Sequence, residues 1–415
     1  IITRRGGPLR RTALVEGGSY GTLRARGAVS GSVDRFDYAF ATEILHSNGF
    51  ARYVDRAAQR AGAWPPVPRS DPTDRVGVAL RVGYRGDGFD VEAGAQGHFN
   101  RAKTDNPFAF APANVYSPFN QARQWTGVAF TRGSFDALDG ALKNRITLSH
   151  TSIDRSSSDT ESCPDFFSDC KTRFRGERSA AEYQGDLKLG AFGLLTFGAR
   201  TETETAKTAQ DFPAGYAGPP FDAISARQTT NSAFALHQAS VGDMDVSLGG
   251  RVDAVAGGKT FPTWRATWAW RLPDIGAKLR ASAGTGARNP SLFQRFSSFG
   301  TPALRPETNA GFDAGVDQSL FGGRMTLSAT AFHNRYRDLI DFRFFGCAPG
   351  QFFGCYFNVG RATTYGVELA AETILVPETW RARASYTHLV AKDDATGAKL
   401  LQRPRDKGVV SMAHG

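Results

Sequence analysis

The segment Trp264-Arg265-Ala266-Thr267-Trp268-Ala269-Trp270 places tryptophan or alanine at every even position and mostly polar residues at the odd ones. The same period of two recurs in residues 36–44, 91–99 and 380–386. Successive side chains of a β-strand point to opposite faces of the sheet, so each segment predicts a strand with one apolar and one polar face. Convincing helical periodicity is absent, and we expect helix to be rare.

The composition narrows the class of protein. The chain has 415 residues and a mean hydropathy of −0.34, yet no stretch approaches the roughly 18 apolar residues of a membrane-spanning helix. This excludes a helical membrane protein but not a β-barrel, whose strands expose every second residue to lipid. The net charge of +10 is scattered along the chain, and the absence of a dense basic run disfavours nucleic acid as a partner.

Short and long connections alternate along the chain. Residues 86–88 form a tight connection and 101–123 a long one, and then 190–192 is tight and 206–226 long. Consecutive antiparallel strands place alternate connections on opposite sides, so all tight turns share one side. We therefore predict an all-β fold, a transmembrane antiparallel up-and-down β-barrel with short periplasmic turns and long extracellular loops. A soluble sandwich or propeller has no reason to keep this asymmetry.

The number of strands predicts that the barrel is incomplete. We count about 18 strands, beginning near Thr12, with the last one beginning near Asp406. A strand in lipid needs a partner on each side, because unsatisfied backbone groups are costly there. The chain ends within a strand-like segment. We therefore expect missing terminal strands and a gapped cylinder with exposed edges at its first and last strands.

Several motifs, in their order, carry a resemblance to a known family. They are Gly250-Arg251-Val252-Asp253, Thr263-Trp264-Arg265, the segment 284–293, Leu304-Arg305-Pro306-Glu307, the segment 332–340 with Asn334, Asp338, Leu339 and Ile340, the segment 356–362, and Thr364-Tyr365-Gly366-Val367-Glu368. This series resembles the late barrel of TonB-dependent receptors, particularly members similar to the vitamin B12 (cobalamin) receptor. Residues 1–6 are similar to the end of the family's plug domain.

The resemblance implies a division of the chain and a function. Residues 1–11 would end the plug and join it to the barrel, and residues 12–415 would form about 18 of the family's 22 strands. The implied function is TonB-dependent active uptake of a scarce nutrient across the bacterial outer membrane, with a cobalamin-type ligand or a ferric siderophore. The implied partners are this ligand, the TonB complex through the missing N-terminal region, and outer-membrane lipid and lipopolysaccharide.

Two other classes of function remain as alternatives. A passive porin or structural outer-membrane barrel would share the strand pattern but would need no plug. An embedded hydrolase would need a Ser or Asp beside a His at the rim, and spacing alone shows no such arrangement. HExxH, P-loop and nucleophile-elbow motifs are also missing from the sequence. We therefore expect no enzymatic activity.

Residues within the motifs have predicted structural roles. Pro306 cannot donate to a β-ladder, so its motif belongs at a strand entrance. We expect Arg305 and Glu307 to form a local ion pair there, either as a structural corner or as a contact to substrate. Gly366 predicts a bend or close packing, and Glu368 is expected to face the lumen.

Two long loops are candidate ligand sites because they combine aromatic rings with polar or basic residues. The first spans residues 101–123 and contains Phe108, Phe110, Tyr116 and Phe119. The second spans residues 288–308 and contains Arg288, Phe293, Arg295, Phe296 and Phe299. Arginine beside aromatic rings suits a bulky, partly anionic ligand such as a metal chelate or corrinoid. The alternative is that the rings form the loops' own small cores and that arginine faces lipopolysaccharide phosphates.

The four cysteines form two close pairs, Cys163 with Cys170 and Cys347 with Cys355. Two local disulfides in an oxidising compartment are the favoured interpretation, and four unpaired loop thiols are the alternative. The first pair lies among Asp154, Asp159, Glu161, Asp165 and Asp169. Such oxygen ligands can hold Ca²⁺, although an acidic loop in solvent is the simpler interpretation. We expect no other metal or cofactor.

Overall fold

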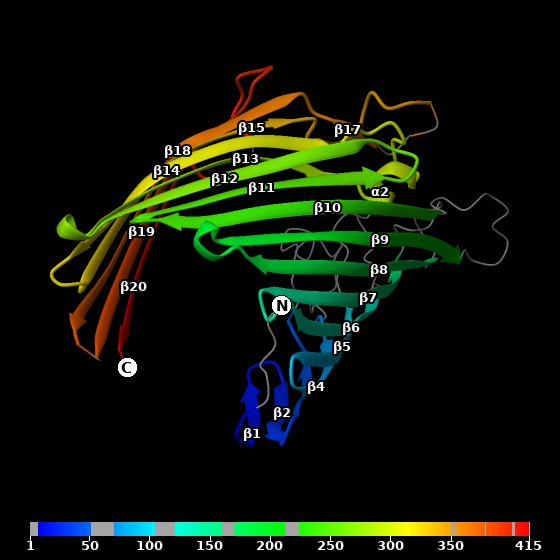
Figure 1. The fold of residues 1–415 in the computed structure, drawn as a ribbon. Coiled ribbons are helices and arrows are strands. Elements are labelled where there is room, and N and C mark those ends of the chain that lie inside the picture. The colour runs from blue at the N-terminus through cyan, green and yellow to red at the C-terminus, as the bar shows by residue number, and fades with distance from the viewer. Residues whose placement is uncertain are drawn as a thin grey trace. The chain divides into compact units, whose positions relative to one another are not determined.

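The computed structural model describes residues 7–50, 70–103, 121–159, 170–211, 224–349, 351, 354–377, 379–400 and 403–414. Strands dominate these residues, and they follow one another as antiparallel hairpins (Figure 1). Eighteen strands form one antiparallel sheet, and β16 and β17 form a separate pair. The strand count and the all-β class agree with the prediction from the sequence.

The strands have the following bounds: β1 (Arg10–Gly18), β2 (Thr22–Val33), β3 (Phe36–Ser47), β4 (Thr73–Arg85), β5 (Phe89–Lys103), β6 (Gln121–Ala137), β7 (Leu142–Asp159), β8 (Cys170–Lys188), β9 (Leu194–Asp211), β10 (Ser225–Val241), β11 (Met244–Val255), β12 (Thr260–Leu272), β13 (Ala277–Arg288), β14 (Glu307–Leu320), β15 (Met325–Arg337), β16 (Ile340–Arg343), β17 (Cys355–Asn358), β18 (Arg361–Val376), β19 (Trp380–Asp393) and β20 (Asp406–His414). Helices are short: α2 (Leu292–Phe296), η1 (Gly190–Phe192) and η2 (Pro273–Ile275). Among the described residues, no helix is both long and apolar enough to cross a bilayer.

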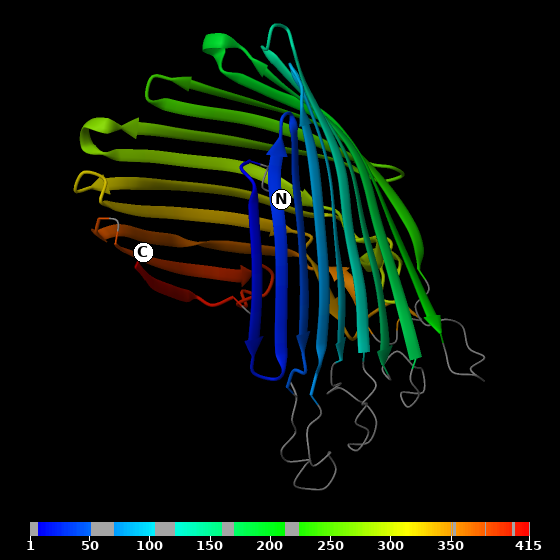
Figure 2. The same ribbon diagram turned by 90° about the horizontal axis from the view of Figure 1, so that it is seen from below.

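The chain forms two compact units. The first comprises Ile1–Tyr183 with Arg200–Thr230, and the second comprises Gln184–Ala199 with Asn231–Gly415. In the first unit, the tight turns that join β2 to β3 and β4 to β5 lie at the opposite end of the strands from the long connections (Figure 2). The first of these turns uses Asp34 at φ 50°, and the second uses Gly88 at φ 80°. The prediction that every tight turn shares one side is therefore only partly right. Residues 19–21 join β1 to β2 by a short turn at the long-connection end, and in the second unit residues 256–259 join β11 to β12 at the same end of the strands as residues 289–306. Chain order fixes the end at which a connection lies, but it does not fix the length of that connection.

Each sheet face has its own chemistry, as the period of two predicts. In β12, Trp264, Trp268 and Trp270 lie on one face and Arg265 lies on the other, since they occupy even and odd positions of the strand. On the neighbouring strand, Val246 lies opposite Trp268 and Gly249 lies opposite Arg265. In β19, Trp380 and Tyr386 lie on one face and Arg381 and Arg383 on the other. We call the two faces the apolar face and the polar face. The apolar side chains are largely exposed, as expected where lipid rather than water is the neighbour.

Aromatic rings lie at both ends of the apolar face in the first unit. At the tight-turn ends, the ring centroid of Tyr84 lies 4.9 Å from Phe36 and 5.7 Å from Phe89. At the other ends, Phe99 lies directly opposite Trp125. Phe89 and Phe99 are ten residues apart on β5, which corresponds to about 33 Å along the strand. At the usual barrel tilt of about 40° this gives roughly 25 Å of height, the thickness of the apolar band of outer-membrane barrels.

The polar face of the first unit contains an ion-pair network. Arg81 donates to Asp37 and to Glu92, each at 2.5 Å, and Arg132 donates to Glu92 at 2.8 Å. The side chains of Arg81 and Asp37 are 6% and 5% exposed. Burial makes a charge depend strongly on its partner, so this network fixes the register of β3 to β6 on the polar face.

The first and last strands are exposed along their whole lengths. β1 pairs with β2 from Arg10 to Gly18, and every one of its residues is exposed. β20 pairs with β19 from Asp406 to His414 and is equally exposed. The expectation of missing strands and a gapped cylinder concerns how the ends of the two units meet, and it stays a prediction.

Candidate ligand-binding site

Two long connections of the second unit pack together at the same end of the sheet. One is residues 289–306, between β13 and β14, and the other is residues 338–360, between β15 and β18. We call these two segments the loop platform. The first begins with α2, which forms because Ser291 caps it in a capping box with Gln294. Leu292, the first residue of α2, is buried, so one side of the helix packs into the platform.

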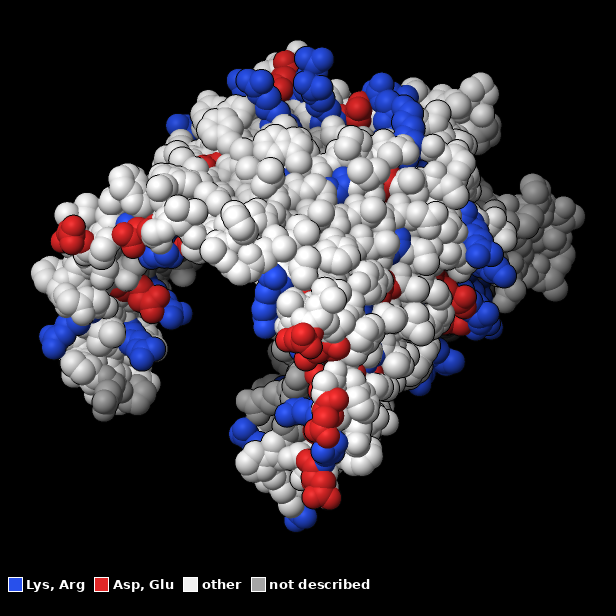
Figure 3. Space-filling model, in the orientation of Figure 1, with Lys and Arg blue, Asp and Glu red and all other residues white. Residues whose placement is uncertain are grey.

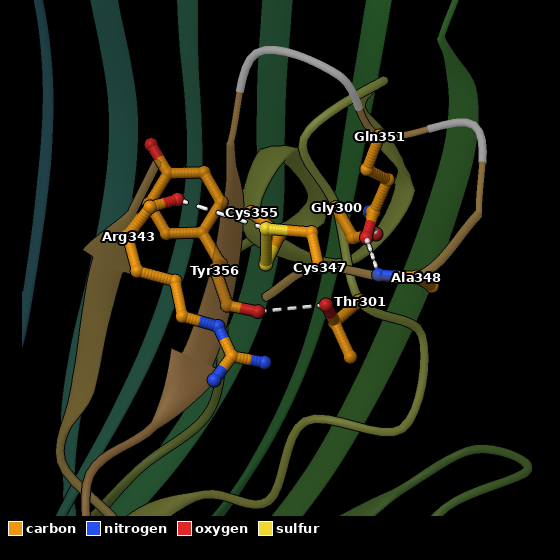
Figure 4. Close-up of a disulfide and its surroundings, with 8 residues drawn as sticks. All are labelled: Gly300, Thr301, Arg343, Cys347, Ala348, Gln351, Cys355 and Tyr356. Carbon is orange, nitrogen blue, oxygen red and sulfur yellow. Dashed lines mark hydrogen bonds between the residues drawn. A yellow bond between two sulfur atoms is a disulfide. The ribbon is translucent and has the colours of Figure 1, made fainter. Parts of the chain in front are cut away.

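A disulfide closes the β16–β17 hairpin (Figure 4). The Cα atoms of Cys347 and Cys355 are 5.8 Å apart, and Cys355 is 2% exposed. Hydrogen bonds join this hairpin to the first segment: Thr301 Oγ1 donates to the Tyr356 carbonyl, and Gln351 Nε2 donates to the Gly300 carbonyl, both at 2.7 Å. The two connections therefore form one ordered body.

Some predicted ligand residues pack inside the platform. The ring of Phe293 meets Tyr356 edge to face at 6.2 Å, and Phe299 meets Phe342 at 5.8 Å. Phe342 in turn contacts Tyr356 at 5.2 Å. These contacts give Phe293 and Phe299 a structural role in holding α2 against the β16–β17 hairpin, which corresponds to the loop-packing alternative.

Other aromatic and basic side chains remain accessible on the platform. Phe296 is 40% exposed, and the Arg295 guanidinium lies 4.7 Å from its ring centroid. Arg288 is exposed and forms an ion pair with Glu307 at 3.1 Å. Beside the disulfide, Phe344 and Phe345 are 68% and 88% exposed.

Sequence reasoning missed Phe344 and Phe345, together with Arg343, whose guanidinium lies 4.7 Å from the Phe357 ring. The sequence signal that could have identified them is the pair of adjacent phenylalanines just before Cys347. Aromatic rings and guanidinium groups exposed on a rigid body suit a large, partly anionic ligand.

The junction beneath the platform joins three of the sequence motifs. The predicted ion pair between Arg305 and Glu307 is wrong: Arg305 pairs with Asp338 at 2.6 Å, and Glu307 pairs with Arg288. Arg305 lies before β14, which begins at Glu307, so strand geometry does not hold the two side chains together, and each has a closer partner on another segment. Glu307 also accepts from the Ile340 amide at 2.8 Å. β14 begins at Glu307, directly after Pro306, so the motif is a strand entrance.

Asn358 completes this junction. Its Oδ1 accepts from the Arg305 amide at 2.8 Å, and its Nδ2 donates to the carbonyls of Arg305 and Asp338 at 2.9 and 2.7 Å. Asp338 has a φ of 58°, which an aspartate tolerates better than most residues. The amide of Val359 donates to the Leu339 carbonyl at 2.6 Å. The entrance of β14, the exit of β15 and the end of β17 are therefore joined by hydrogen bonds in one junction.

Further along the sheet, two motif residues have the predicted surroundings. A Cβ atom at Gly366 would lie 1.9 Å from the His388 carbonyl oxygen, so the glycine permits close packing of β18 on β19. Glu368 lies opposite Thr330 on the polar face. Asn334 lies opposite Gly311, also on the polar face.

The polar face of the second unit contains a cavity of about 780 Å³ at β11 to β14. Its lining includes Arg265 and Arg280, and Arg280 donates to Thr330 Oγ1 at 2.6 Å. Ser282 donates to Asp313, and Lys278 pairs with Asp317 at 3.0 Å. Arg265, Arg280, Ser282 and Asp313 thus supply charged and polar groups to the lining of this cavity.

Several predicted residues lie outside the described residues. They are Phe108, Phe110, Tyr116, Phe119, Cys163, Glu161, Asp165 and Asp169. Cys170 begins β8, and Asp159 ends β7. Within the described part of the chain, no group of three or more His, Cys, Asp or Glu side chains is arranged to hold a metal ion. Asp154 instead pairs with Arg173 and Arg175, at 2.5 and 3.1 Å. The proposed Cys163–Cys170 disulfide and the Ca²⁺ site remain predictions.

Comparison with known proteins places this geometry in context. A family model described as "TonB dependent receptor-like, beta-barrel" matches residues 11–414. The ferripyoverdine receptor of Pseudomonas aeruginosa is similar in fold, with a TM-score of 0.75 and 14% identity over 99% of this chain and 59% of that one. The copper transporter OprC is similar in fold as well, with a TM-score of 0.77 and 14% identity over 99% of this chain and 65% of that one.

The siderophore receptor PirA from Acinetobacter baumannii is also similar, with a TM-score of 0.73 and 14% identity over 96% of this chain and 64% of that one. At these identities the likeness concerns the fold. The chain spans about three fifths of the length of each of these proteins.

Proposed function

The chain belongs to the TonB-dependent receptor β-barrel family of the Gram-negative outer membrane, and we propose that the whole protein takes up a metal chelate by TonB-dependent active transport. The loop platform is the observation that carries this proposal. It exposes aromatic rings and guanidinium groups on a body fixed by a disulfide and by hydrogen bonds between its segments.

The chemistry of the platform supports a large, partly anionic ligand. Flat aromatic faces bind the apolar and conjugated parts of such a ligand, and guanidinium groups bind its carboxylate or phenolate oxygens. The three similar structures are named for ferripyoverdine, copper and a siderophore. These names favour a ferric siderophore or another metal chelate over cobalamin, the ligand class that the sequence motifs suggested first.

The remaining parts of the transport cycle follow from the family. We propose that the ligand reaches the platform from outside, and that residues 1–11 connect the barrel to a plug domain that contacts TonB. The polar face then lines the route of the ligand, and Arg265 and Arg280 attract its anionic groups. No covalent step is needed, because the receptor moves its ligand unchanged.

Growth of a deletion strain tests the proposed cargo. The full receptor gene should restore growth on a limiting ferric chelate and should leave growth on limiting cobalamin and limiting copper unchanged. If the gene restores growth on limiting cobalamin alone, the transported ligand is a corrinoid instead. Uptake that persists in a strain without TonB would overturn active transport and would favour a passive porin.

A pair of variants tests whether the platform binds the ligand. We expect F344A/F345A in the full receptor to weaken binding of the active chelate at least tenfold, because two exposed rings are lost. Phe321 provides the control, since it is 75% exposed in the tight turn between β14 and β15. F321A should bind normally, and equal losses in both variants would count against the platform.

A further inference from the structure

The apolar face of the first unit changes its chemistry from one strand to another. In β4 this face carries aliphatic side chains, all of them exposed: Val76, Val78, Leu80 and Val82. At β6 to β9 the same face contains a hollow of about 520 Å³. We call it the polar hollow, because its lining includes Thr131, His150, Ser179, Thr201 and Thr203.

The pairing of the strands gives the depth of the polar hollow. Leu80 lies opposite Ala95, and Ala129 lies opposite both Ala95 and His150, on the two strands beside it. His150 therefore shares a face and a row with Leu80. Ala129 is four residues from Trp125, in the outer aromatic row, which is about 13 Å along the strand and roughly 10 Å in height at a tilt near 40°. The hollow thus lies near the middle of the hydrocarbon band.

The polar groups of the hollow can form more hydrogen bonds than they make. His150 Nδ1 and Ser179 Oγ share a hydrogen bond of 2.9 Å. The other ring nitrogen of His150 and the hydroxyls of Thr131 and Thr201 have no partner among the residues that the structure describes. A polar group without a partner is costly in hydrocarbon, so lipid is a poor neighbour for this part of the face.

A charged row lies on the same face, directly above the hollow. Glu177 is exposed, two residues before Ser179 on β8, and it forms no ion pair with any described residue. Arg175 pairs with Asp154 at 3.1 Å, yet its side chain remains 49% exposed. Figure 3 shows charged side chains of both signs near the right-hand end of β8. A carboxylate and a guanidinium two residues apart call for a neighbour with the opposite charges.

The depth of the hollow decides between lipid and protein as that neighbour. Lipids carry their polar groups at the two surfaces of the bilayer and only hydrocarbon at its centre. A protein can carry polar side chains at any depth, and small residues let two membrane-spanning segments approach closely while Ser and Thr bond across the contact. In the outer membrane such a segment is the wall of another β-barrel.

We propose that the polar hollow and the charged row form the contact between two copies of this receptor, related by a two-fold axis perpendicular to the membrane. A two-fold axis brings the same surface of both copies together, so the polar groups meet at equal depth. Hydroxyl groups both donate and accept hydrogen bonds, which makes the hollow complementary to itself. The axis also sets Glu177 of each copy against the partner's Arg175, and a long arginine side chain spans the difference in height, roughly 5 Å.

The size of this surface predicts a reversible dimer. Four strands are about 19 Å wide, and the hydrocarbon band is roughly 25 Å high, so the outline covers about 480 Å² on each copy. A standard stable interface buries about 800 Å² on each partner. The contact is independent of the transported ligand, since it lies on the lipid side of the sheet.

Two charge reversals in the full receptor test the contact. E177R and R175E each set like charges against one another across the axis, so either variant alone should associate at least tenfold more weakly than the wild type. A mixture of the two variants presents opposite charges at both contacts and should associate within about threefold of the wild type. Fluorescence energy transfer between labelled receptors in lipid vesicles measures association, and a heat-modifiability gel confirms that each variant is folded.

A second pair of variants tests the hollow itself. H150A/S179A removes polar groups at mid-depth and should weaken association at least fivefold, because hydrogen bonds across the contact are lost. L80A is the matched control, since Leu80 lies in the same row on β4 and is 50% exposed, and it should associate normally.

Three results would overturn the proposal. The first is a wild-type receptor that stays monomeric at every density in the vesicles. The second is a mixture of E177R and R175E that remains apart, and the third is an equal loss of association in L80A and H150A/S179A. If cross-linking in native membranes joins this surface to a different barrel and never to a second copy, the assignment of the partner is wrong.

Discussion

Arg305 and Asp338 belong to different long connections, yet a guanidinium nitrogen of one lies 2.6 Å from a carboxylate oxygen of the other. Asn358, at the end of β17 in the same connection as Asp338, bonds to the backbone of both residues. The junction thus joins the entrance of β14, the exit of β15 and the end of β17. Its rigidity explains how residues on the loop platform keep a fixed arrangement above the sheet.

The hydrogen bonds of this junction predict which of two substitutions destabilises the platform more. N358A removes three hydrogen bonds and should destabilise the platform by about 2–3 kcal/mol, at roughly 1 kcal/mol per bond. R305A should cost less than about 1 kcal/mol, because the side chain of Arg305 is 60% exposed. Limited proteolysis of residues 289–306 in the folded receptor measures both. Greater sensitivity of R305A than of N358A would contradict this account.

The disulfide should stabilise the platform locally. Removing Cys347–Cys355 in the double variant C347S/C355S frees a loop of eight-residue separation, which should cost about 2–3 kcal/mol of local stability. We expect faster proteolysis within residues 344–354 and an unchanged unfolding temperature of the barrel. The wild type treated with a reductant should behave in the same way. A large fall in the barrel's unfolding temperature would show that the disulfide acts beyond its loop.

Gly366 should tolerate no side chain. G366A would place a methyl group 1.9 Å from the His388 carbonyl oxygen, so β18 and β19 must separate, at a cost of about 2 kcal/mol or more. The control is G133A on β6, where nothing lies within 4 Å of the added Cβ. Urea unfolding of both variants in lipid vesicles compares them. A neutral G366A would mean that the strands relax freely.

The buried ion-pair network should be sensitive to loss of a single partner. R81A leaves Asp37 and Glu92 without their shared guanidinium, and we expect a loss of about 3–5 kcal/mol in unfolding free energy. Arg85 lies 3.6 Å from Asp37 but is 53% exposed, so R85A should change stability by less than about 1 kcal/mol. Denaturant unfolding measures the difference, and similar values for the two variants would contradict the role of burial.

Opposite faces of β11 should respond differently to charge. L248R places a cation on the apolar face, where Leu248 is 63% exposed, and should destabilise the inserted barrel by about 2–4 kcal/mol. S247R places the same cation on the polar face, beside the cavity, and should cost little. Folding into vesicles, followed by heat modifiability, tests both. Equal tolerance at the two positions would show that this face does not contact lipid.

Much of the fold could be predicted from the sequence because its signals are local. Alternation in residues 264–270 separates the tryptophans from Arg265 wherever the strand pairs, since the backbone alone imposes the period of two. Pro306 marked the entrance of β14 because a residue without an amide hydrogen cannot lie within a ladder. The contrast between short and long connections likewise needed no knowledge of pairing.

The candidate site depended on which of several possible partners each side chain contacts, and the sequence does not specify that partner. Arg305 and Glu307 are neighbours in the chain, and proximity suggested that they pair, but their partners are Asp338 and Arg288. Phe293 and Phe299 carried the same signal as Phe296, and packing against β16 and β17 decided which rings remain accessible.

The sequence by itself determined which residues of each strand share a face and at which end each connection lies, because both follow from strand geometry and chain order. Register between strands decided the rest. It placed Arg101 opposite Arg123 and Trp125 opposite Asp154, and so gathered basic side chains of β5, β6 and β8 that form no basic run in the sequence. The physical reason is that a cross-strand neighbour lies about 5 Å away whatever its separation along the chain, and only the folded sheet specifies which residue it is.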